Sequence, residues 1–134
     1  MAKKEILFTV SRDILLNANV SRHYHDKGNR ARALRAMANE IGTEIKEQED
    51  VFFEHFKVTV YICPPTRRRM DPPNLYPTIK HLIDGLTDAG WWEDDDWTRL
   101  DTLSFKYGGL SEVKNHYQVR MIIEEIEKEV SSNE

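Results

Sequence analysis

Cysteine is almost absent from the sequence, and long apolar runs are missing. The single cysteine, Cys63, excludes an internal disulfide framework and fits a reducing compartment. No apolar stretch approaches the roughly 20 residues that a membrane span requires. The beginning of the chain, MAKKEILFTV, lacks the apolar centre of a signal peptide. We therefore expect a cytoplasmic protein, or a viral protein made in a cytoplasm, with no membrane partner.

Basic residues are outnumbered by acidic ones, which gives a net charge of −4. That balance argues against a protein that simply coats nucleic acid. The charges are unevenly distributed, however: basic residues gather at 22–35 and 67–69, and acidic residues gather at 93–96 and in the C-terminal tail. This pattern fits a surface that binds a polyanion beside an acidic pocket, and it also fits an ordinary mixed surface.

Length and hydrophobic content predict one folded domain over residues 1–134, since the chain is 40% hydrophobic. Alternating apolar residues predict strands at 5–10 and 51–63, and further strands near 98–107 and 116–124. Apolar stripes of helical period predict helices at about 29–46 and 75–89. The fold class is therefore α+β, in the order β-α-β-α-β-β, with two helices packed on a mixed sheet of about four strands. The connection 108–115 suits a hairpin, and the tail from about 126 to 134 is expected to fray.

The start of the second helix determines what Asp71 can do. With Asn74 as the N-cap, Pro77 falls in the first turn, where its missing N–H costs nothing. Asp71 then precedes the helix and is free for another role, while Gly90 is placed to cap the C-terminus. Residues 11–29 read as a long polar loop, and such loops in compact domains tend to be functional.

Acidic residues flank this second helix, with Asp71 before it and Asp94, Asp95 and Asp96 after it. A helix of that length spans about 22 Å. The chain must therefore fold back, or a second subunit must contribute, before these carboxylates can meet. If they do meet, oxygen ligands without cysteine favour Mg²⁺ or Mn²⁺. Such a metal could activate water and stabilise charge on a scissile phosphate.

Each of these features also has a simpler explanation. An Asp-rich loop is usually a solvated turn, and three arginines can line a solvated edge. Asp71 could form a turn with Pro72, and Lys80 with Asp84 could be a weak surface ion pair. The tryptophans are expected to fill the core or a dimer interface, although one could stack on a base: Trp91, Trp92 and Trp97. The joint occurrence of these features favours a functional site.

The segment RRRMDPPNLYPTIKHLIDGLTDAGWWEDDD, residues 67–96, resembles the RusA family of Holliday-junction resolvases, endodeoxyribonucleases common in phages and prophages. The family pattern is a basic run, an Asp-x-Asp-Asn-Leu segment, a helical lysine, an Asp-Ala-Leu-like step, an aromatic residue and a pair of aspartates. More loosely, the polar loop and the last two strands also match, so the resemblance covers most of the chain. The matching residues are Arg67–Arg69, Asp71, Asn74-Leu75, Lys80, Asp84-Gly85-Leu86, Gly90-Trp91-Trp92 and Asp94-Asp95.

Two departures from the family pattern concern the site. Pro73 stands where the family has its second aspartate, so one carboxylate is missing. The segment from Asn74 to Gly90 is also longer than the family pattern by about one helical turn. Aligning from the end of the helix places Lys80 on the family lysine and keeps its spacing of four to Asp84, because a one-turn insertion preserves the helical face.

The resemblance implies a RusA-like fold and a homodimer that resolves four-way or other branched DNA by paired symmetric nicks in recombination and repair. It implies Mg²⁺, with Mn²⁺ as a substitute, and no organic cofactor. The implied metal ligands are Asp71, Asp94 and Asp95, and the implied catalytic residues are Asp71, Lys80, Asp84 and Asp95. Lys80 would stabilise charge on the phosphate or orient the attacking water, with Asp84 positioning it. The implied DNA-binding residues, which predict salt-dependent binding, are Arg22, His23, Lys27, Arg30, Arg67, Arg68 and Arg69.

Three other functions remain open from the sequence. The missing carboxylate is consistent with a protein of the same fold that binds branched DNA without cleaving it. A metal-dependent phosphohydrolase acting on nucleotides has little support, because the sequence has no Gly-rich phosphate loop and no His-Asp cluster. A protein-interaction module, with the acidic loop as a solvated surface, is the third.

Overall fold

Alternating apolar residues form four strands of one sheet: β1 (Lys3–Ser11), β2 (Phe56–Cys63), β3 (Leu100–Tyr107) and β4 (His116–Glu125). The structure, a computed structural model, describes residues 2–127. The strand order is β1-β4-β2-β3. β4 runs antiparallel to both β1 and β2, whereas β2 and β3 are parallel. The expected mixed sheet is therefore confirmed.

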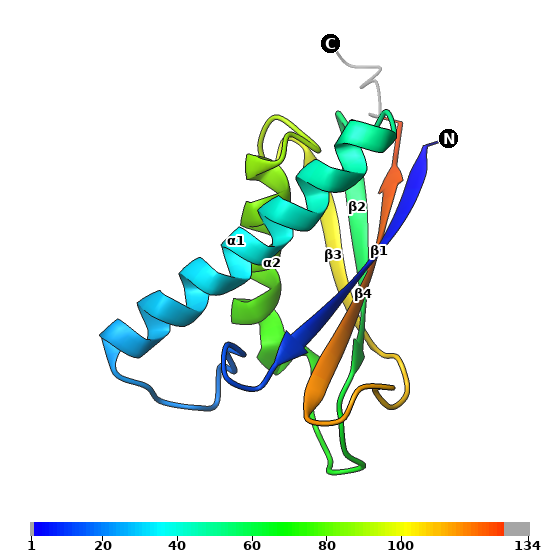
Figure 1. The fold of residues 1–134 in the computed structure, drawn as a ribbon. Coiled ribbons are helices and arrows are strands. Elements are labelled where there is room, and N and C mark those ends of the chain that lie inside the picture. Colours follow the sequence, from blue (N-terminus) through cyan, green and yellow to red (C-terminus); the bar gives the residue numbers. More distant parts are fainter. Residues whose placement is uncertain (1, 128–134) are drawn as a thin grey trace.

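Two helices, α1 (Tyr24–Gln48) and α2 (Tyr76–Asp88), lie on the same face of the sheet and cross each other (Figure 1). A short 3-10 helix, η1 (Pro72–Leu75), precedes α2. The core lies between the helices and the sheet, because the strands turn every second side chain toward α1 and α2. Its fully buried members include Phe8, Leu34, Val60, Leu82 and Met121. The described residues thus form a single α+β domain with the predicted order of elements.

The predicted hairpin between the last two strands is wrong. β2 lies between β3 and β4 and pairs with both of them. Residues 108–115 instead pass over the end of β2, where the N–H of Gly108 donates to the carbonyl of Ile62 (2.8 Å) and that of Ser111 donates to the carbonyl of Pro64 (2.7 Å). Crossing one strand requires about 10 Å at the usual strand spacing, and this connection is long enough to do so.

The polar segment before the first helix is shorter than predicted. α1 begins at Tyr24 rather than near residue 29, because the side chain of His23 caps it by accepting from the N–H of His25 (3.2 Å). Asp26 also bonds Arg30 one turn later (3.1 Å). These first turns extend past the sheet (Figure 1). They therefore need no apolar stripe, and the sequence shows no helical pattern there.

Other element boundaries differ by a few residues. β2 begins at Phe56 rather than at Val51, although Val51 and Phe53 are buried. Asn74 lies inside η1 and is not the N-cap, while Pro77 falls in the first turn of α2 as predicted. The expected frayed tail lies mostly outside the described residues. Within those residues, neither helix has the length and apolar character needed to cross a membrane.

The crossing of the two helices depends on Gly85. A Cβ at this position would lie 2.4 Å from the carbonyl oxygen of Arg35 and 2.6 Å from the Cβ of Ala38. Both neighbours belong to α1, and one is backbone, so neither can move aside alone. Gly85 therefore sets how closely α2 approaches α1.

Gly85→Ala is expected to lower the free energy of unfolding by about 1–3 kcal/mol, because the added methyl group forces the helices apart. Chemical denaturation measures this. The matched control is Gly28→Ala in α1, where a Cβ would meet only the flexible guanidinium end of Arg32, at 3.3 Å. Equal effects of the two substitutions would contradict the role given to Gly85.

Candidate functional site

The turn after α2 is fixed by Gly90, whose φ of 83° is readily adopted by glycine. Its N–H donates to the carbonyl of Thr87 (3.0 Å), and the N–H of Trp91 donates to the carbonyl of Leu86 (3.1 Å). These two bonds form a Schellman motif, so the predicted cap is confirmed. The direction in which the chain leaves α2 is set here.

Two buried tryptophans then anchor the chain. The indole N–H of Trp91 donates to the carbonyl of Gly42 in α1 (2.9 Å). The ring of Trp92 stacks on Phe56 of β2 with 4.3 Å between ring centroids. The predicted core position is confirmed for both, whereas Trp97 is 86% exposed and lies outside the core. The acidic segment 93–96 therefore starts from a rigid point.

The acidic segment folds back beside α2 and brings Asp95 to Lys80. The ammonium of Lys80 donates to Asp84 Oδ1 (2.7 Å) and to Asp95 Oδ2 (3.1 Å). Both carboxylate side chains are 19% exposed, and that of Lys80 is 42% exposed. We call these three residues the Lys80 cluster. Lys80 and Asp84 lie on one helix, whereas Asp95 comes from the segment after it, so the sequence alone could not place Asp95 beside them.

The Lys80 cluster keeps its lysine charged. Burial lowers the pKa of Lys80, but the hydrogen bonds that the ammonium donates to Asp84 and Asp95 outweigh this effect, and the net pKa is raised above its ordinary value. At neutral pH the side chain is an ammonium ion. It can therefore stabilise negative charge, and it is poorly suited to act as a base.

Two further groups border the Lys80 cluster. His81 Nδ1 lies 3.7 Å from Asp84 Oδ2, and burial lowers the pKa of this imidazole. Arg35 of α1 makes two hydrogen bonds to Asp88, at 2.6 and 2.8 Å. Sequence reasoning did not pair Arg35 with Asp88, because the contact joins two helices and has no signal in local spacing.

The other acidic residues of the segment shape the turn. Asp94 Oδ1 accepts the N–H of Asp95 (2.8 Å). Asp96 accepts from the N–H of Thr98 (3.0 Å) and from its hydroxyl, and the latter bond is the main reason that the pKa of Asp96 is lowered. For Asp96 the simpler explanation, a carboxylate that stabilises its own turn, is sufficient.

A basic groove lies at the other end of α2. Two adjoining hollows, of about 580 and 350 Å³, share Asn17, Arg68, Arg69, Met70 and Tyr117 in their walls. We call them together the arginine groove; its charged lining residues are Arg12, Arg22, Arg68, Arg69 and Asp71.

Two polar groups of the arginine groove have unused hydrogen-bonding capacity. Asp71 occupies the N-cap position of η1, where Asn74 was expected as the cap, but within the described chain its carboxylate makes no capping bond there. The Nε of Arg22 is buried and finds no partner among residues 2–127. A terminal nitrogen of Arg22 is paired with Asp26 (3.3 Å), whereas Arg12, Arg68 and Arg69 make no ion pair within the described chain. These three guanidinium groups suit a phosphate backbone, and Asp71 adds one carboxylate beside them.

The remaining predicted DNA-binding residues are more dispersed. Arg67 is exposed on the same turn but does not line the arginine groove. His23 caps α1, and Lys27 lines a separate hollow. Arg30 donates to the carbonyls of Arg12 and Leu15 (2.9 Å each), so it stabilises the loop after β1.

Sequence reasoning missed Arg12 and Tyr117 as lining residues of the groove. Arg12 directly follows β1 and Tyr117 lies near the start of β4, and Val10 of β1 is paired with Tyr117. Both reach the groove because the end of β1 lies beside the start of its antiparallel neighbour β4, at the same end of the sheet. The sequence alone does not specify that pairing.

The predicted metal ligands do not form one group within the described chain. Asp94 and Asp95 follow α2, whereas Asp71 precedes it in the arginine groove. Across residues 2–127, no set of three or more His, Cys, Asp or Glu side chains is arranged to hold a metal ion. The donor chemistry still suits Mg²⁺, which binds carboxylate oxygens and fills its remaining positions with water or substrate phosphate.

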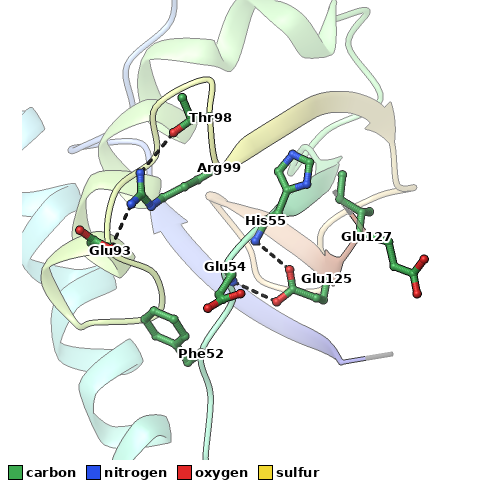
Figure 2. A pocket seen from close by; sticks show the side chains of 9 residues that line it. Phe52, Glu54, His55, Glu93, Thr98, Arg99, Glu125 and Glu127 are labelled. Carbon is green, nitrogen blue, oxygen red and sulfur yellow. Dashed lines mark hydrogen bonds and ion pairs between the residues drawn. The ribbon is translucent and has the colours of Figure 1, made fainter. Parts of the chain in front are cut away.

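A further hollow, of about 700 Å³, lies elsewhere and does not suit a phosphate ligand (Figure 2). Among the described residues its lining includes four glutamates, which Figure 2 shows around it, and a single arginine, Arg99, which is paired with Glu93 (3.0 Å). Glu125 accepts the backbone N–H groups of Glu54 (2.9 Å) and His55 (2.8 Å), so part of this acidity has a structural role.

Comparison of the chain with protein-family models gives no match, and comparison with curated proteins gives none either. We therefore infer a function from the Lys80 cluster and the arginine groove.

Replacing either carboxylate of the Lys80 cluster is expected to lower the pKa of Lys80. Asp84→Asn and Asp95→Asn each remove an anionic acceptor and leave the lysine just as buried. NMR titration of the Lys80 side-chain resonances measures the change, with the exposed Asp50→Asn as the control. Unchanged pKa values in both variants would contradict the cluster.

The raised pKa of Lys80 in the wild-type protein also makes the free energy of unfolding depend on pH. Because folding raises the pKa of Lys80, its contribution to the free energy of unfolding is present at neutral pH. That contribution is lost as the pH rises through the folded-state pKa.

Proposed function

We propose that this protein is a metal-dependent endodeoxyribonuclease that resolves Holliday junctions and other branched DNA by paired symmetric nicks. We place its action in recombination and repair, in a cytoplasm where its single cysteine stays reduced. The observation that carries the proposal is the Lys80 cluster, in which Asp84 and Asp95 hold one charged lysine, on the same helix that begins at the arginine groove. The RusA-like fold and the homodimer belong to this proposal and rest on the resemblance.

The arginine groove would hold the DNA backbone. Arg68 and Arg69 lie in its wall together with Arg12 and Arg22, and guanidinium groups match phosphate oxygens in geometry and charge. Asp71 lies in the same groove. A strand bound there would place a phosphate close to a free carboxylate at the start of α2.

Lys80 would stabilise charge on the phosphate under attack. An ammonium group has three N–H donors, and Asp84 and Asp95 use two of them. The third is available for a phosphate oxygen, and the partial exposure of Lys80 permits that approach. Asp84 and Asp95 would act as positioning residues for Lys80 in this step.

Mg²⁺ or Mn²⁺ would supply charge neutralisation at the scissile phosphate and an activated water when bound. Asp71, Asp94 and Asp95 are the residues that would hold it. Because Asp71 stands apart from the other two within a protomer, we propose that the homodimer completes the ligand set. A two-fold arrangement can supply groups across an interface.

A branched-DNA-binding protein without nuclease activity is the second candidate function. It is favoured by Pro73, which replaces a carboxylate of the family pattern, and by the separation of Asp71 from Asp94 and Asp95. This protein would bind junctions through the arginine groove and would need no metal.

Purified protein is expected to nick a labelled four-way junction in pairs with Mg²⁺ or Mn²⁺, and not with a chelator. A linear duplex of the same sequence should stay intact. Asp71→Asn should lower the nicking rate by about 100-fold or more, because it removes a proposed ligand of the metal that neutralises charge at the scissile phosphate. Asp50→Asn, at an exposed site outside the groove, should cut at the wild-type rate.

Tight junction binding without nicks under any metal would instead support the non-cleaving protein. The absence of any preference for the junction over the duplex would contradict both functions.

A further inference from the structure

A hollow of about 370 Å³ lies between the loop after β1 and the first turns of both helices. We call it the loop pocket. Much of its wall is apolar, with Leu16 and Val20 from the loop, Ala31 from α1 and Pro77 from α2. Lys27 and His81 add one charged and one polar group. Its volume is in the range of small-molecule sites.

The loop side of this pocket is held by hydrogen bonds and does not depend on a ligand. The N–H of Leu16 donates to Thr78 Oγ1 (2.8 Å), and the same hydroxyl donates to the carbonyl of Leu16 (2.7 Å). Thr78 is fully buried. The N–H of Ala18 also donates to the carbonyl of Asn74 (2.8 Å). The pocket is therefore preformed.

The loop pocket and the arginine groove are separated by a single stretch of chain. Asn17 and Val20 line both of them. Val20 is 43% exposed, so an apolar side chain stands at the boundary without being covered. On its far side the pocket ends at His81, which neighbours Lys80 in sequence and lies 3.7 Å from Asp84. The pocket thus lies between the groove and the Lys80 cluster.

We propose that the loop pocket receives an unpaired nucleobase from branched DNA whose phosphates lie in the arginine groove; this inference rests on the proposed function. The apolar walls suit the faces of a planar ring, and the ammonium of Lys27 suits the phosphate of the same nucleotide. A base within a duplex is stacked and paired, so only an unpaired or extruded base can enter. Lys27, which does not line the arginine groove, thereby gains a specific role.

The test uses a four-way junction with 2-aminopurine beside the branch point, titrated with the full-length protein in chelator so that no cutting occurs. Fluorescence of 2-aminopurine should rise on binding, because the base leaves its stack. No Phe, Tyr or Trp is among the described residues that line the loop pocket and could quench it. Ala31→Leu should abolish the rise by filling the pocket, and it should weaken binding on the order of tenfold.

Two further variants separate pocket filling from general damage. Ala36→Leu places the same side chain at an exposed position of α1 and should behave as wild type. Val20→Ser removes apolar surface at the exposed boundary, where misfolding is not expected, and should reduce the rise in fluorescence.

Salt-sensitive junction binding with the same fluorescence in wild type, Ala31→Leu and Val20→Ser would overturn the base pocket and leave the proposed function standing. Absence of junction binding by the wild-type protein would overturn both.

Discussion

The anchoring of the chain after α2 is the constraint on which the candidate site depends. Gly90 turns the chain, and Trp91 and Trp92 fix it to α1 and β2, so segment 93–96 can return along α2. Without that anchor, Asp95 would be a solvated residue of an acidic turn. With it, Asp95 reaches Lys80. The position of Asp95 in the site therefore depends on the packing of Trp91 and Trp92 in the core.

Charges of opposite sign are separated within this small domain. Arginines gather at the end of the sheet where α2 begins, and glutamates surround the hollow of about 700 Å³, which lies elsewhere. A protein with a net charge of −4 can therefore still present a local cationic surface to a polyanion. The acidic surfaces would repel DNA, which favours binding through the arginine groove.

Local patterns predicted most of the fold because they depend on near neighbours in sequence. The alternation from Phe56 to Ile62 specified a strand, and the spacing of Lys80 and Asp84 placed them together on one helical face. The hairpin prediction failed because strand pairing is a long-range choice, decided by β2 filling the centre of the sheet. For the same reason the sequence left open whether Asp95 folds back onto α2, and it could not assign Arg12 to the groove.

In the proposed mechanism Lys80 and Asp84 act as one unit on the phosphate, because Asp84 serves only to position the lysine. A double-mutant cycle of single-turnover junction nicking tests this, using Lys80→Met, Asp84→Asn and the double variant. Residues that act as a unit have strongly non-additive effects. We predict that each single change slows nicking severely and that the double variant is about as slow as the slower single variant. Effects of the two changes that multiply independently, or nicking by Lys80→Met at the wild-type rate, would show that Lys80 and Asp84 do not act as one unit.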